Sequence, residues 1–304
     1  MSRRIVGGFP ALALGLSLLA AGVRAQERPP SPSEQYRAIL KTSEDRSNAS
    51  HKEFVASAPK GGEHSDEQRM TFVGRAYRIK YEQAPKLVEL AEKYPKDPIA
   101  LDALTEAVWQ VNTVPWPVER VGRDEARPRA FALRERDHLR SDRLGPLCER
   151  ISYGLCAEYE SFLRAVLEKN PHREVRARAC LALAHYLNNR ALRLDLVRDQ
   201  PALAREFADL YGKDYLDALR GQEHTGAVAE AEALFERAAR DYGDMKLPDG
   251  ETVAEKAGPE LFGIRHLSVG KVAPEIEGAD QDGVRFKLSD YRGKVLLLDF
   301  WSEY

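Results

Sequence analysis

The sequence is poor in cysteine, methionine and tryptophan, and neither sign of charge is in surplus. Of its 304 residues, three are Cys, three are Met and three are Trp. Lys and Arg together number 46 and Asp and Glu number 48, which gives a formal net charge of -2. Such a chain lacks the positive field that holds a phosphate backbone or an anionic lipid surface. The composition therefore argues against a nucleic acid as a partner.

Long apolar runs are scarce too, and the one near the start is shorter than the ~20 residues that span a bilayer. The stretch 9–23 is apolar and follows the basic pair Arg3 and Arg4. A basic start, a short apolar stretch and small residues before a cleavage site are typical of a secretory signal peptide. We expect residues 1–25 to be removed after Ala25. The mature protein is then exported, into the periplasm, without a membrane span.

The three cysteines form no redox motif. They are Cys148, Cys156 and Cys180, none of them in a Cys-x-x-Cys, and their odd number leaves at least one unpaired or paired between chains. On one continuous helix, eight residues give ~12 Å of rise, so Cys148 and Cys156 could be bridged only if Gly154 breaks the helix. We expect all three to be small buried core residues with inert thiols.

Other chemical motifs are also missing from the sequence. The seven histidines are scattered without a His-Glu-x-x-His spacing, and there is no Gly-x-Ser-x-Gly elbow, Walker loop or dinucleotide fingerprint. We predict no metal site and no cofactor. Nothing from Glu34 to His266 indicates a reaction.

What the chain does have is length for two domains and an apolar content of 43%. Residues 26–33, QERPPSPS, have the composition of a polar, Pro-rich linker. Residues 34–266 show the spacing of amphipathic helices almost throughout. We expect a short helix over 34–41, and a loop over 42–50.

A helical hairpin recurs within residues 34–266. The segments LAEKYPKDPIALDAL and VLEKNPHREVRARACLAL share a helix, a Glu-Lys end, a Pro turn and a second helix. Helix pairs are predicted at 85–93 with 99–111, at 159–169 with 174–188, and at 227–242 with 252–264. The pattern resembles tetratricopeptide-type hairpins. We predict a mainly α, repeat-like domain, which could bind a protein partner.

The stretch 120–143 is rich in arginine but interleaved with acidic residues. It predicts a solvated helix face with i,i+4 ion pairs rather than a binding patch.

After Leu267 the pattern changes from helix to strand. Pro274 favours an extended lead, because the residue before a proline is driven to the β region. Asp282-Gly283 is a strong hairpin dipeptide between the short predicted strand 275–279 and the segment 284–288.

The hairpin is followed by a single turn and a predicted strand. Ser289 is placed to cap the turn 290–292, which Gly293 closes. The apolar run 295–301, VLLLDFW, is typical of a central strand buried on both faces.

Four motifs in this order resemble the redoxin family, that is the alkyl hydroperoxide reductase/thiol-specific antioxidant group and the TlpA-like thiol-disulfide oxidoreductases. They are the Val-Gly-x-x-Ala-Pro lead at 269–274, the Asp-Gly hairpin, the Leu-Ser-Asp-Tyr-Arg-Gly-Lys turn at 288–294, and the strand ending in Phe-Trp. The resemblance implies that 267–304 is the start of a thioredoxin-like α/β domain, truncated after its hairpin and first central strand. Its scaffold residues here are Pro274, Asp282, Gly283, Ser289 and Gly293.

In that family the strand leads into Trp-x-x-Trp/Tyr-Cys-x-x-Cys, where a helix N-terminus stabilises the attacking thiolate. Here the flanking residues are Trp301, Ser302, Glu303 and Tyr304, so the nucleophile is expected immediately after Tyr304. Three explanations compete: a UGA codon for selenocysteine read as a stop, a mutation or sequence-end artefact, or a natural short protein. We favour the first, because a random truncation has no reason to fall at the position of the nucleophile. Selenocysteine also makes chemical sense there, since a selenol is a better nucleophile than a thiol.

The resemblance implies an exported thiol-disulfide oxidoreductase or antioxidant redoxin, which acts on protein thiols and disulfides or on peroxide and is catalytically incomplete in this chain. The alternative is a helical-repeat interaction or scaffold protein with a vestigial redoxin stub. In either case the apolar run 295–301 lacks the neighbouring strands that would bury it, so we expect poor packing there unless the helices cover it.

Overall fold

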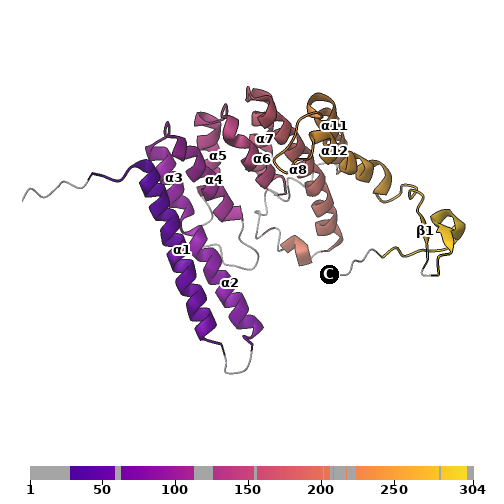
Figure 1. Ribbon diagram of the computed structural model, residues 1–304, viewed down its shortest axis with the longest axis horizontal. Coiled ribbons are helices and arrows are strands. Elements are labelled where there is room, and N and C mark those ends of the chain that lie inside the picture. Colours follow the sequence, from indigo (N-terminus) through magenta and orange to yellow (C-terminus); the bar gives the residue numbers. More distant parts are fainter. Residues whose placement is uncertain are drawn as a thin grey trace, which may run out of the picture.

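The computed structural model describes residues 28–58, 63–112, 126–153, 156–200, 202–205, 208, 217, 224–280 and 282–299. The described residues are mainly helical, in agreement with the predicted class, and their strands are β1 and β2. Figure 1 shows the helices side by side in a row that begins with α1 and α2 and ends with α11 and α12. The small β-hairpin lies beyond α12.

The elements have the following bounds. The helices are α1 (Pro32–Ala56), α2 (Asp66–Tyr81), α3 (Ala84–Lys93), α4 (Pro98–Asn112), α5 (Ala126–Asp137), α6 (Gly145–Ile151), α7 (Ala157–Lys169), α8 (Arg173–Asp199), α11 (His224–Tyr242) and α12 (Val253–Phe262). The short turns are η1 (Asp142–Leu144), η2 (Gly263–Leu267) and η3 (Leu288–Tyr291), and the strands are β1 (Glu277–Ala279) and β2 (Arg285–Lys287).

Three helices begin at a capping box. Ser31, Ser65 and Thr252 precede α1, α2 and α12, and each hydroxyl accepts a hydrogen bond from the backbone N–H three residues later. A cap of this kind stabilises a helix by about 1 kcal/mol. One prediction is corrected here, because α1 begins at Pro32, inside the predicted linker 26–33.

The prediction for α1 was wrong beyond its first turns. The expected helix 34–41 continues through the expected loop 42–50 without a break. Ser43 and Ser50 are the buried residues of this helix. Small polar side chains at these positions let α1 pack closely against its neighbours without an apolar stripe, so the periodicity that reveals most helices is missing.

The predicted helical hairpins are present. The pairs α3 with α4, α7 with α8, and α11 with α12 pack against one another. Their bounds lie close to those expected except in α8, which was predicted to end at 188 and continues to Asp199. The turn between α7 and α8 is held by Asn170, whose side-chain amide donates to the carbonyl oxygens of Leu139 and Ser141, both at 2.8 Å. This amide joins the turn to the segment before α6 and so links neighbouring helix pairs.

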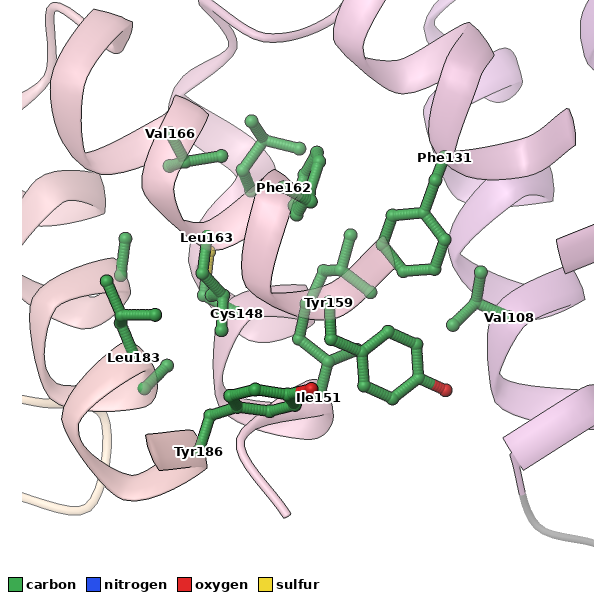
Figure 2. Close-up of a cluster of buried hydrophobic side chains, with 14 of the residues drawn as sticks. Val108, Phe131, Cys148, Ile151, Tyr159, Phe162, Leu163, Val166, Leu183 and Tyr186 are labelled. Atoms are coloured by element: carbon green, nitrogen blue, oxygen red, sulfur yellow. The ribbon is translucent and has the colours of Figure 1, made fainter. Parts of the chain in front are cut away.

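The core of the helical body is built around α7 and α8. Figure 2 shows Phe162, Leu163 and Val166 of α7 among side chains from the neighbouring helices. The ring of Phe162 meets that of Phe131 edge to face, with 5.3 Å between the ring centroids. Phe162 is fully buried. Aromatic pairs in this geometry stabilise a core beyond the area that they bury.

The arginine-rich stretch is not the solvated face that its composition predicted. Residues 120–125 lie outside the described part of the chain, but α5 carries Arg134, which is fully buried. Arg129 pairs with Glu92 of α3 at 2.6 Å, so its partner is on another helix rather than four residues away. The composition could not reveal this, because burial depends on what packs over the helix.

The signal peptide predicted for residues 1–25 lies outside the described residues. Among the described helices, none combines the length and the apolarity that a membrane crossing needs.

Candidate functional site

The C-terminal hairpin forms where the motifs place it. β1 and β2 pair antiparallel, with Glu277 opposite Lys287 and Gly278 opposite Phe286. The pairing continues one step further, because the Leu288 N–H donates to the Ile276 oxygen at 2.9 Å. The ring of Phe286 lies over Gly278, where an added Cβ would come within 3.2 Å of it. A glycine at this position therefore lets the ring pack directly against the opposite strand.

The hairpin loop holds the predicted Asp282-Gly283 dipeptide. Asp280 and Val284 close the loop through a backbone bond of 3.0 Å, and Gly283 has a φ of 79°. One carboxylate oxygen of Asp280 accepts the N–H groups of Asp282 at 3.0 Å and Val284 at 2.9 Å. A left-handed glycine at the end of a short hairpin loop is the expected use of this residue.

The turn after β2 differs from the prediction in its cap. Ser289 lies within η3, so it does not cap the turn. The carboxylate of Asp290 accepts the Lys287 N–H at 2.9 Å and closes the first turn instead. The Ser289 N–H donates to Glu275 at 3.0 Å, and hydrogen bonds from Ser289 hold the pKa of the Glu275 carboxyl below its usual range. Ser289 thus connects η3 to the lead before β1.

Gly293 closes the turn as predicted, with a φ of 82°. The predicted central strand 295–301 is not formed over its described residues, 295–299. A central strand requires hydrogen-bonded neighbours on both sides, and within the described residues β1 and β2 pair only with each other. Val295 and Leu297 are exposed, as expected for an apolar strand without neighbours.

None of the described residues from 263 to 299 is buried. Pro274 is half-buried in the extended lead, and the hairpin projects away from the helices (Figure 1). The motif-flanking residues Trp301, Ser302, Glu303 and Tyr304 lie outside the described residues. The structure therefore brings Pro274, Gly283, Ser289 and Gly293 into one small unit, and it does so without help from the helical body.

The cysteines are far from this unit in the fold. Cys148 lies on α6, Cys156 precedes α7 and Cys180 lies on α8, and all three are buried and outside any disulfide. Burial raises the pKa of the Cys148 thiol to about 12 and that of Cys180 to about 11. At neutral pH both are protonated, and a thiol attacks only as its thiolate. The predicted role as inert core residues agrees with this arrangement.

The three thiols are therefore expected to resist modification in the folded protein. With an aromatic disulfide reagent at pH 8, the folded protein should react so little over minutes that almost no coloured product forms. The reagent cannot reach the buried cysteines, and their thiols are protonated. In guanidinium chloride all three should react. Rapid reaction of one thiol in the native protein would contradict the burial of these residues.

The exposed apolar segment 295–298 is expected to drive self-association. Val295 and Leu297 are 102% and 94% exposed, so both apolar side chains are open to contact with another molecule. The double variant Val295→Lys/Leu297→Lys should reduce light scattering on concentration several-fold and leave the melting temperature unchanged. Val55→Lys, at an apolar residue of α1 that is 56% exposed, serves as the control. An equal reduction of light scattering in Val55→Lys would show that self-association does not depend on segment 295–298.

A second candidate site lies in the helical body, and no sequence motif indicated it. A cavity of about 290 Å³ lies between α6, α8, α12 and the turn 243–252. Its lining includes Glu149, Tyr153, Arg178, His185, Asp249 and Lys256. Because these residues come from four separate segments, only the fold brings them together. Its two lining carboxylates, Glu149 and Asp249, are paired with its two lining cations, Arg178 and Lys256.

Within the described ranges, no three His, Cys, Asp or Glu side chains come together in a way that could hold a metal ion. Comparison with protein-family models, with curated proteins and with solved structures gives no match to this chain. Its function must therefore be argued from its own residues.

Proposed function

We propose that residues 267–304 are the opening part of a thioredoxin-fold redoxin domain, and that the protein is an exported thiol-disulfide oxidoreductase or peroxide-reducing redoxin. The order of the four motifs between Val269 and Trp301 carries this proposal. The β1–β2 hairpin and the turn closed by Gly293 support it, because both lie where the motifs require them. A hairpin alone occurs in many folds, so the motif order is the stronger support.

In this proposal the nucleophile follows Tyr304 and sits at a helix N-terminus. A thiolate or selenolate there attacks one sulfur of a substrate disulfide, or the O–O bond of a peroxide. The helical residues 34–266, with their tetratricopeptide-like hairpins, would position this domain or recruit its protein substrate. Cys148, Cys156 and Cys180 take no part.

The nucleotides after the Tyr304 codon test the assignment. A Cys codon or UGA, followed in frame by codons for Gly-Pro-Cys or a similar run, supports it. Any other codon at that position overturns it.

The activity is tested on protein extended through those codons. It should reduce insulin disulfides with a dithiol as electron donor, or consume peroxide, whereas a variant with Ser at the nucleophile should do neither. The 304-residue chain is a second inactive control, since its thiols are buried. A folded extended protein without either activity would favour the alternative of a helical interaction or scaffold protein.

Export is part of the same proposal. Protein recovered from the periplasm should have Gln26 as its first residue, because cleavage is expected after Ala25. N-terminal sequencing distinguishes this from a retained leader.

A further inference from the structure

A cavity of about 660 Å³ opens between α7, α8 and α11, where α8 packs against both of the other helices (Figure 1). We call it the arginine cavity. Among the described residues, its charged lining consists of three arginines and two glutamates, which are Arg164, Arg176, Arg237, Glu168 and Glu230. The lining therefore carries one positive charge in excess.

The charges around Arg164 compensate one another. Arg164 contacts Glu230 at 2.6 Å and Glu160 at 2.8 Å, and Glu160 also holds Arg190. Hydrogen bonds from Arg164 keep the pKa of the Glu230 carboxyl below its usual range, so both partners are charged at neutral pH. These two arginines and two glutamates leave no net charge for a ligand.

Arg237 is only loosely paired. Its guanidinium lies 3.6 Å from the carboxylate of Asp241, and Arg240 holds the same carboxylate at 2.9 Å. One carboxylate thus serves two arginines. The positive charge that this leaves lies on α11, at the wall of the cavity that faces α8.

Arg176 of α8 lacks a carboxylate partner within the described part of the chain. Its hydrogen bond there is a long one, from Nη1 to the Asn170 oxygen at 3.5 Å. The Nε of Arg176 is buried and has no hydrogen-bond partner among the described residues. A buried donor without an acceptor destabilises the folded state, so an acceptor supplied by a ligand would remove a cost that the protein otherwise bears.

The unpartnered edge of Arg176 has the geometry of a carboxylate site. The N–H groups on Nε and Nη2 of a guanidinium are parallel, and the two oxygens of one carboxylate accept both. Arg176 is half-buried, so a rotation of its side chain can turn this edge to the cavity. One carboxylate would also balance the single excess charge of the lining, whereas a doubly charged phosphate would exceed it.

The floor of the arginine cavity is apolar. Leu167, Leu183 and Leu234 line it, one from each helix, and the side chain of Tyr242 lies beside them. All four residues are buried. An apolar group packed on this floor would be removed from water. The cavity therefore suits a ligand with a carboxylate head and an apolar body.

Glu168 opposes an anion in the same cavity. It is exposed, and it forms no ion pair with the residues that the structure describes. Its carboxylate repels a negatively charged ligand and is free to compete for Arg176. Neutralising Glu168 should therefore strengthen binding, which is an effect that a merely structural role of these residues would not produce.

We propose that the arginine cavity binds a small monocarboxylate with an apolar body, with Arg176 holding the carboxylate and Arg237 adding a second cation from the neighbouring helix. The volume of about 660 Å³ lies within the range of pockets that enclose a small molecule. This site goes beyond the redoxin assignment and is independent of it.

The test uses 4-phenylbutyrate and its uncharged amide, 4-phenylbutyramide, in isothermal titration calorimetry at pH 7 with the 304-residue chain. Phenylbutyrate should bind saturably, and the amide should bind at least tenfold more weakly. Arg176→Gln should weaken phenylbutyrate binding by about tenfold, because it removes a charged two-pronged donor. Glu168→Gln should tighten it at least twofold. Circular dichroism checks that each variant is folded, and if Arg176→Gln is not, the amide and Glu168→Gln still decide.

Arg75→Gln is the matched control. Arg75 is an exposed arginine of α2 that pairs with Glu53 at 2.6 Å, and α2 lies at the other end of the row of helices from α11 (Figure 1). Its affinity for phenylbutyrate should stay within twofold of the natural chain. The proposal is overturned by an absence of binding, by equal binding of the amide, or by an unchanged affinity in a folded Arg176→Gln. Weaker or unchanged binding by Glu168→Gln, an equal loss in Arg75→Gln, or tighter binding of inorganic phosphate than of phenylbutyrate would overturn it as well.

Discussion

Replacement of Arg134 by methionine is expected to raise the free energy of unfolding by about 3 kcal/mol. For a chain of this size that corresponds to an increase in melting temperature of roughly 5–10 °C. The gain would be unusual, since most core substitutions destabilise a protein. It follows from the burial of a charged group that has no hydrogen-bond partner among the described residues.

The guanidinium of Arg134 is fully buried, and within the described part of the chain none of its three nitrogens has a hydrogen-bond partner. Its nearest favourable contact is the ring of Phe131, 5.5 Å from the guanidinium carbon. Burial lowers the pKa of Arg134 to about 9. A cation in this position destabilises the folded state, and an apolar side chain of similar length removes that cost.

The effect should depend on pH with a defined sign. Because the pKa is lower in the folded state than in the unfolded chain, the unfolded chain holds more protons above about pH 9, and stability then rises with pH. The full cost is present below pH 9. The advantage of Arg134→Met should therefore be constant between about pH 6 and 8 and shrink above about pH 9.

The matched control is Arg129→Met on the same helix. Arg129 is 41% exposed in its side chain and paired with Glu92, so its loss should change stability by less than about 1 kcal/mol. Urea unfolding followed by circular dichroism gives both values. A loss of stability in Arg134→Met would show that the guanidinium has a partner in solution.

Replacement of Phe162 by alanine is expected to lower the free energy of unfolding by about 4 kcal/mol. The ring is fully buried at the centre of α7, and it packs edge to face on Phe131 (Figure 2). Removing it leaves a cavity that rigid neighbouring helices cannot fill, and it also removes the aromatic pair.

A graded series separates this loss from a general effect of mutation. Phe162→Leu keeps most of the volume and should cost about 1–1.5 kcal/mol. Met70→Ala, at a residue of α2 that is 49% exposed, should change stability by less than about 0.5 kcal/mol. Equal costs for Phe162→Leu and Phe162→Ala would mean that the neighbouring helices collapse into the space.

Helices with a regular apolar stripe could be predicted from the sequence alone. In the predicted helix 99–111, Leu101, Leu104, Val108 and Val111 recur at helical spacing, and all four are buried. The same reasoning failed for α1, whose buried residues are small serines rather than large apolar side chains. The spacing of apolar residues in the sequence therefore predicts the buried face of a helix only when that face is apolar.

In the C-terminal hairpin unit, too, some features could be predicted from the sequence and others could not. Gly283 and Gly293 could be placed because a turn that needs a positive φ selects glycine at a single position. The strand predicted after Gly293 requires neighbouring strands, and its described residues form no strand and are exposed. Strand formation is a property of the sheet rather than of the segment.

The sequence by itself determined the helix pairs, most of the turn positions and the redoxin-like order of motifs, because each depends on residues close together in the chain. The tertiary structure alone decided that Arg134 is buried without a hydrogen-bond partner among the described residues, and that Glu149 and Asp249, from separate segments, meet around one cavity. The burial of a side chain and its electrostatic environment depend on residues that are distant in sequence, so a local sequence pattern cannot predict them.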